Sequence, residues 1–97
     1  MHVIAAEVMA HDEITPRYFV LQLRAPEIAA GARPGQFVQI RCHDSLLVPL
    51  LPRPFSIMTA DTTQGTIELL YRVEGIGTRM LSTMRPGTQL PLWGPLG

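Results

Sequence analysis

Residues 18–24 read Tyr18-Phe19-Val20-Leu21-Gln22-Leu23-Arg24, and this stretch decides the fold class. The apolar residues Phe19, Leu21 and Leu23 occupy every second position in it. An extended chain points successive side chains to opposite faces, so a period of two gathers one kind of residue on one face. The stretch therefore predicts a β-strand with one buried face.

The same period of two recurs through most of the chain. Turn signals separate the runs: Pro34-Gly35 and Pro86-Gly87 suit type II turns, and residues 61–65 resemble a hairpin loop. We expect Asp12-Glu13-Ile14-Thr15-Pro16 to break the first two runs. The six predicted strands cover residues 3–9, 18–24, 37–42, 54–59, 66–73 and 88–93.

One segment has helical rather than alternating spacing. Met80, Leu81 and Met84 share one side of it, which predicts a short helix over about residues 77–85. Either of its first two residues can cap its start. Mostly antiparallel strands with short turns and one short helix predict an all-β fold, a small closed or nearly closed barrel.

Composition limits the size and the chemistry of the chain. A length of 97 residues predicts one domain, and a formal net charge of zero argues against nucleic acid as a partner. No apolar run approaches the roughly 20 residues of a membrane span, so no membrane partner is expected for this chain either. Its first residues lack the basic region of a signal peptide, so we expect a cytoplasmic protein. All eight cationic residues are arginines, which excludes lysine-based catalysis. The lone Cys42 is interpreted as a small buried residue, with a reactive thiol as the alternative.

Arg53-Pro54-Phe55-Ser56 combines three useful side chains at the start of a predicted strand. The guanidinium of Arg53 is a permanently charged fork that fits a phosphate. Phe55 offers a flat face to another ring, and Ser56 offers a small hydroxyl. A ligand with a diphosphate and an aromatic ring system, such as FAD, would use all three. The alternative is an ordinary entry into a strand.

Gly75-Ile76-Gly77-Thr78 directly precedes the predicted helix. A helix N-terminus exposes unpaired N–H groups that bind phosphate, and glycine lets the backbone approach closely. The alternative here is a simple turn with an N-cap. One hairpin separates this segment from Arg53 and can bring the two together, which favours the interpretation as a phosphate site.

Other features carry less chemistry. The apolar segment 46–52 holds two prolines and is either a loop over one end of the barrel or an exposed patch for another domain or subunit. His2, His11 and His43 are interpreted as surface or loop residues. Trp93 is expected to fill the core or to pack against further sequence rather than to stack on a ligand. No spacing typical of a catalytic triad or a metal cluster occurs.

Four segments taken together resemble the FAD-binding domain of the ferredoxin–NADP reductase superfamily. They are Arg53-Pro54-Phe55-Ser56, Gly75-Ile76-Gly77-Thr78, Pro86-Gly87 and Gly94-Pro95-Leu96-Gly97. Within the superfamily the chain is most similar to the electron-transfer subunits of type B dihydroorotate dehydrogenases, which belong to pyrimidine biosynthesis. The alternative within the superfamily is the flavin subunit of a related hydrogenase or sulfite reductase. The resemblance covers residues 1–97 and implies a six-stranded antiparallel Greek-key barrel that holds FAD.

The resemblance also implies roles for the matching residues. Arg53 would bind the diphosphate, Phe55 would lie near the flavin or its ribityl chain, and Ser56 would lie near the reactive edge of the isoalloxazine. Gly77 and Thr78 would hold phosphate oxygens. The implied cofactor-binding residues are Arg53, Pro54, Phe55, Ser56, Leu70, Tyr71, Arg72, Gly77 and Thr78. Strict alternation puts Phe55 and Ser56 on opposite faces, so both can contact one flavin only at a strand end or an irregularity.

Two parts of the superfamily pattern are not expected in this chain. The nicotinamide-binding domain would begin where the sequence stops at Gly97, and a single cysteine cannot build a four-cysteine [2Fe–2S] site. We therefore expect part of an FAD-dependent NAD(P)H oxidoreductase, inactive in isolation. In the implied longer protein, electrons would pass between FAD, an iron–sulfur cluster and NAD, beside a catalytic dehydrogenase subunit. The alternative is a non-enzymatic β-barrel interaction module that uses the apolar segment 46–52.

Overall fold

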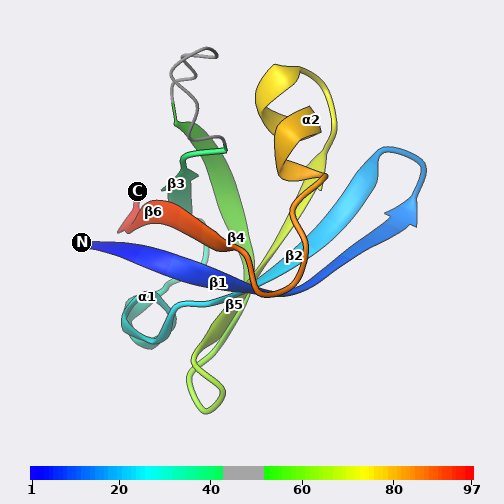
Figure 1. The fold of residues 1–97 in the computed structure, drawn as a ribbon. Coiled ribbons are helices and arrows are strands. Elements are labelled where there is room, and N and C mark those ends of the chain that lie inside the picture. Colours follow the sequence, from blue (N-terminus) through cyan, green and yellow to red (C-terminus); the bar gives the residue numbers. More distant parts are fainter. Residues whose placement is uncertain (43–51) are drawn as a thin grey trace.

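The structure is a computed structural model that describes residues 1–42 and 52–97, so His43 and residues 46–51 of the apolar segment lie outside the described residues. In the described ranges, six antiparallel strands close into a barrel (Figure 1). The strands are β1 (His2–Thr15), β2 (Tyr18–Arg24), β3 (Phe37–Ile40), β4 (Arg53–Asp61), β5 (Thr66–Arg72) and β6 (Gln89–Leu96). The predicted all-β barrel of six antiparallel strands is confirmed.

The strand order around the barrel is β1-β2-β5-β4-β3-β6. Strands β3, β4 and β5 follow one another as neighbours, but β2 pairs with β5 instead of β3. This arrangement is the expected Greek key. The barrel closes where residues 2–7 of β1 pair with residues 89–94 of β6, so neither strand is left as an open edge there.

The hairpin between β1 and β2 is longer than predicted, and the expected break at residues 12–16 is wrong. β1 continues to Thr15, which pairs with Tyr18, and the turn is made by Pro16-Arg17. Arg17 has a φ of +74°, and its N–H donates to the Glu13 carboxylate at 3.0 Å. Pairing with β2 up to Thr15 and this hydrogen bond stabilise an extended chain where the local sequence favours a turn.

The other predicted turns are present. The glycines of Pro34-Gly35 and Pro86-Gly87 have φ values of +87° and +94°, a backbone conformation that favours glycine. In the hairpin loop of residues 61–65, the Asp61 carboxylate accepts two backbone N–H groups at 2.9 Å each. These turns therefore follow from local residue chemistry alone.

Two short helices occur in the described residues, where one was predicted. The unpredicted α1 (Pro26–Gly31) starts with a proline and has an acidic residue in its first turn, both typical of a helix start. α2 (Ile76–Leu81) begins near the predicted position, but its N-cap is Gly75 and it ends before residue 85. α2 lies at the opposite end of the barrel from the β4–β5 loop (Figure 1). None of the helices in these ranges is long and apolar enough to cross a membrane.

A β-bulge in β1 changes which side chains face the core. Val8 pairs with Leu23, and both are fully buried. The register then shifts between Val8 and Ala10, after which His11 pairs with the fully buried Leu21. Because cross-strand partners share a face, the extra residue turns His11 toward the interior.

Candidate functional site

A pocket of about 490 Å³ lies at the end of the barrel beside α2. The start of β4, the end of β5 and the first turn of α2 form its walls. Its lining residues are Arg53, Pro54, Phe55, Ser56, Leu70, Tyr71, Arg72, Glu74, Gly75, Gly77 and Thr78. The nine residues that the sequence analysis named for cofactor binding all lie in this lining. Glu74 and Gly75 were not named, although they join the two predicted segments.

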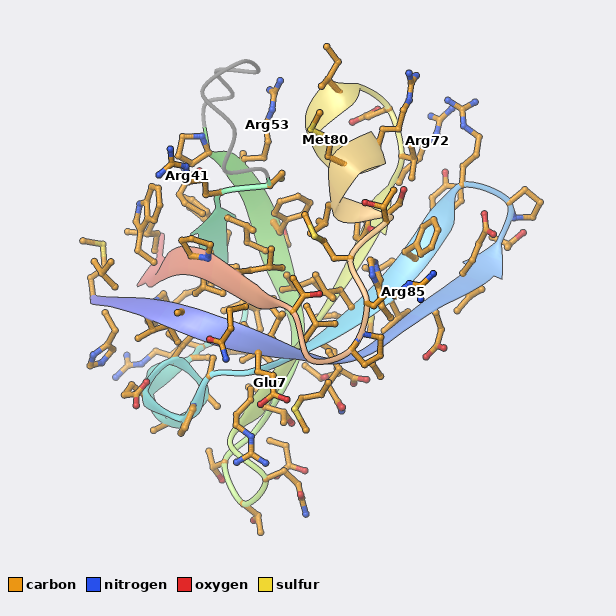
Figure 2. All side chains as sticks on the ribbon, viewed as in Figure 1. Glu7, Arg41, Arg53, Arg72, Met80 and Arg85 are labelled. Atoms are coloured by element: carbon orange, nitrogen blue, oxygen red, sulfur yellow. The ribbon has the colours of Figure 1, made fainter. Side chains whose placement is uncertain are left out.

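Arg53 and Gly77 form one side of the pocket. A Cβ atom at Gly77 would lie 3.3 Å from Arg53 Cγ and 3.4 Å from Arg53 Nε, which is tighter than ordinary contact. Glycine therefore lets the arginine stem lie across the backbone of α2. Figure 2 shows Arg53 beside this helix. The two phosphate-compatible elements predicted from the sequence are neighbours in space.

Thr78 organises the backbone that precedes and begins α2. Its hydroxyl accepts the Glu74 N–H at 2.8 Å and donates to the Gly75 carbonyl at 3.4 Å. The second contact is long for an O–H donor, so the hydroxyl hydrogen can turn toward an acceptor in the pocket. Thr78 is thus suited both to hold its own loop and to bind an anionic oxygen.

The charges around the pocket favour an anion. Arg53 and Arg72 are exposed and bring two positive charges, whereas Glu74 brings one negative charge. Figure 2 shows both arginine side chains at the end of the barrel that carries α2. The net charge of the lining is positive, which suits a diphosphate better than a neutral ligand.

Phe55 and Ser56 obey the alternation of β4. Phe55 is only 6% exposed and meets Tyr71 edge-on, with ring centroids 5.6 Å apart and an interplanar angle of 80°. Ser56 is exposed. The broad face of Phe55 proposed for ring stacking is therefore largely covered by protein, because the residue points into the barrel. Both residues still reach the pocket, since they stand near the beginning of the strand.

The interpretation of His11 as a surface or loop residue is wrong. It lies within β1, partly buried, with Nε2 2.6 Å from the Tyr71 hydroxyl and Nδ1 2.8 Å from the Met84 carbonyl oxygen. The β-bulge described above is the physical reason, and simple alternation could not reveal it. His2 is exposed as expected, and Trp93 is half-buried on β6 rather than in the core.

Cys42 is fully buried, as predicted. Burial raises the pKa of the Cys42 thiol to about 11, and the nearby Arg53 charge lowers it only in part. A thiol that stays protonated at neutral pH is a poor nucleophile. Among residues 1–42 and 52–97, no three His, Cys, Asp or Glu residues gather in a way that could hold a metal ion.

Comparison with protein families identifies the class. The model of the family described as "Oxidoreductase FAD-binding domain" matches residues 1–97, and the chain belongs to that family. A solved structure of an NADH-dependent reduced ferredoxin-NADP oxidoreductase has the same fold, with a TM-score of 0.86 and 29% identity. The match covers 97% of this chain and 33% of that one.

Two curated relatives are similar at the level of sequence. The electron transfer subunit of dihydroorotate dehydrogenase B (NAD(+)) from Desulforamulus reducens is 42% identical over 98% of this chain and 36% of its own length. The corresponding subunit from Enterococcus faecalis is 42% identical over 93% of this chain and 34% of its own length. The chain thus spans about a third of the relatives it matches.

FAD is the cofactor of the family, and the geometry of the pocket suits it. The stem of Arg53 lies in the space that a Cβ of Gly77 would need, which places the guanidinium of Arg53 beside the first turn of α2. A positively charged lining suits a diphosphate, and so does the Thr78 hydroxyl, whose donated hydrogen bond is long. The apolar Leu70 is 45% exposed and lies in the same lining, where it can cover part of a flat ring system. The residues present therefore fit the cofactor.

Proposed function

We propose that residues 1–97 form the FAD-binding domain of a flavin-dependent electron-transfer subunit, and that this subunit serves a dihydroorotate dehydrogenase that uses NAD. Two relatives 42% identical to this chain carry that name, which supports the proposal. Because the chain spans about a third of those relatives, the dehydrogenase activity is proposed for the longer assembly.

One observation carries the binding site in this proposal. Residues from two separate segments of the sequence meet at one pocket, and the stem of Arg53 lies across Gly77. A lone arginine or a lone glycine turn would be ordinary. Their contact places a charged donor beside the first turn of α2, which is an environment that suits a diphosphate.

We propose the following division of roles within the pocket. Arg53 and Thr78 bind the diphosphate through the guanidinium and the hydroxyl, and Gly77 contributes its backbone at the first turn of α2. Arg72 adds positive charge, and Leu70 and Tyr71 form apolar wall beside the flavin. The remaining proposed contacts are Pro54, Phe55 and Ser56.

Bound FAD would supply hydride and one-electron transfer, and the chain would bind and orient it. In the proposed assembly electrons also pass through an iron–sulfur cluster, whose cysteines this chain with its single Cys42 cannot provide. We further propose a catalytic dehydrogenase subunit as the protein partner and the cytoplasm as the location.

Titration of the purified chain with FAD and with riboflavin tests the binding site. Quenching of flavin fluorescence should saturate with FAD and should be much weaker with riboflavin, because riboflavin lacks phosphate. Equal binding of the two would contradict a diphosphate site. Absence of saturable FAD binding would favour the alternative, an interaction module without a flavin.

A further inference from the structure

Tyr71 is linked through His11 to β1, which lies two strands away in the barrel. Tyr71 is 6% exposed, belongs to β5 and lines the pocket, whereas His11 belongs to β1. His11 Nε2 lies 2.6 Å from the Tyr71 hydroxyl, and His11 Nδ1 lies 2.8 Å from the Met84 carbonyl oxygen. Met84 follows α2 on the way to β6. One imidazole thus joins the wall of the pocket to β1 and to the α2–β6 connection.

The direction of these hydrogen bonds follows from the chemistry of the partners. The Met84 carbonyl oxygen can only accept, so Nδ1 carries a hydrogen and donates. In the neutral imidazole Nε2 is then an acceptor, and the Tyr71 hydroxyl donates to it. Burial raises the pKa of the Tyr71 phenol, which keeps this hydrogen in place.

The Tyr71 ring also packs against two aromatic rings. Phe19 stacks on the Tyr71 ring with centroids 5.6 Å apart, and Phe55 meets it edge-on at the same distance. The imidazole of His11 is tilted against Phe19 at 5.1 Å. Ring contacts of this kind tolerate sliding and tilting, whereas a hydrogen bond fixes one direction.

We propose that His11 is a positioning residue for the FAD pocket: by accepting the Tyr71 hydrogen it fixes the ring that forms part of the pocket wall. This inference rests on the proposed function, because it assumes that FAD binds beside Tyr71. His11 does not touch the cofactor in this proposal. It acts through Tyr71 alone, and its bond to Met84 holds the imidazole in the required tautomer.

The expected effect follows from the population of the binding-competent ring position. A hydrogen bond of ordinary net strength favours one position by about 5- to 10-fold. When that bond is lost, the competent fraction falls and the apparent affinity falls with it. FAD should therefore bind about twofold more weakly to a variant that lacks the bond if the two ring positions are otherwise equal, and up to about 5- to 10-fold more weakly if the unbonded ring prefers the other position.

Two substitutions of His11 separate its two hydrogen bonds. His11→Gln places an amide near the position of Nε2, where it can still accept from Tyr71. His11→Asn places its amide near Nδ1 and can reach only Met84. Tyr71→Phe removes the same bond from the other side with the loss of one oxygen atom, and His2→Asn on the exposed end of β1 is the matched control. The probes are the dissociation constant for FAD and the visible circular dichroism of the FAD-saturated chain.

We expect near-normal affinity for FAD in His11→Gln and in the control His2→Asn. His11→Asn and Tyr71→Phe should lose equal amounts of FAD affinity. The double variant His11→Asn/Tyr71→Phe should lose no more than either single variant, and the saturated spectra of all three should change alike. If the wild type binds FAD but the variants match it in affinity and spectrum, the inference is overturned while the proposed function stands. Additive losses also overturn it. A wild type that fails to bind FAD overturns both. If His11→Asn does not fold, Tyr71→Phe against His11→Gln decides.

Discussion

Replacing Arg53 with alanine should weaken FAD binding more than replacing any arginine outside the pocket. The substitution removes a charged donor whose stem lies across the backbone of α2, 3.3 to 3.4 Å from where a Cβ of Gly77 would be. The barrel should stay folded, because Arg53 is exposed and stands at the first residue of β4. The loss therefore falls on the ligand rather than on the core.

The size of the effect follows from the strength of hydrogen bonds to charged groups. Such bonds contribute about 1.5–3 kcal/mol, which corresponds to about 10- to 150-fold in affinity. Solvent screens the charge of the exposed Arg53, and the charge of Arg72 remains in the pocket of the variant. The expected loss of FAD affinity is therefore about 10- to 30-fold. Arg53→Lys keeps the charge but loses the planar fork, and it should give an intermediate loss.

The assay is a flavin fluorescence titration of the wild type and of three alanine variants. Arg24→Ala and Arg33→Ala are the controls, because both arginines are exposed and lie outside the lining of the pocket. Each control removes one positive charge, as Arg53→Ala does. An equal loss of affinity in all three variants would show a general charge effect and would refute a specific role for Arg53. Thermal unfolding of each variant without FAD checks that the barrel is intact.

Three further changes test other parts of the structure. Gly77→Ala should weaken FAD binding, because the added Cβ displaces the Arg53 side chain. Since alanine has the higher helix propensity, the free energy of unfolding should stay unchanged or rise by up to about 1 kcal/mol. Glu74→Gln should tighten FAD binding by about two- to fivefold at low salt, because it removes a negative charge from an anion pocket. Burial raises the pKa of Cys42 from 9.0 to about 11. The stabilisation that comes from burying the protonated Cys42 thiol is therefore complete below pH 9 and is lost as the pH rises through about 11. Urea unfolding should show the free energy of unfolding fall by about 2–3 kcal/mol over that range.

Each of these predictions has a matched control and a contrary result. Gly31→Ala, with no atoms within 4 Å of its Cβ, should leave FAD affinity unchanged, and an effect equal to that of Gly77→Ala would argue against close packing. Glu27→Gln in α1 should not tighten FAD binding, and tightening that persists at high salt would contradict a charge effect. The alkaline loss of stability should shrink in Cys42→Ala, and an unchanged pH dependence would assign it to other groups.

Much of the barrel could be predicted from local patterns. The alternation in residues 18–24 matches β2, and the glycines of Pro34-Gly35 and Pro86-Gly87 have the positive φ expected from their turns. The helix near Gly77 was also foreseen to within a few residues. α1 was missed because its six residues are too few for a clear period, although its proline and its acidic residue mark a helix start.

The composition of the pocket was predictable for a related reason. Arg53 and Gly77 stand at the start of a strand and of a helix, where the residue types themselves indicate a phosphate contact. Glu74 was not predicted, because a single acidic residue in a turn usually indicates a solvent-exposed surface position. Only its position between Arg72 and Gly75 in the folded lining shows that it affects the charge of the site.

The sequence by itself determined the strands, most turns and the residue types of the pocket, because these depend on alternation, on glycine and proline, and on side-chain chemistry within a few positions. The tertiary structure alone decided how far β1 extends, how Phe55 is covered and where His11 points. Each of these depends on contacts with another element. Pairing with β2 keeps β1 extended to Thr15, and Tyr71 of β5 meets Phe55 edge-on. The bulge in β1 reverses which side chains of the strand face the core. A bulge shifts every following residue by one face, and no local pattern records it.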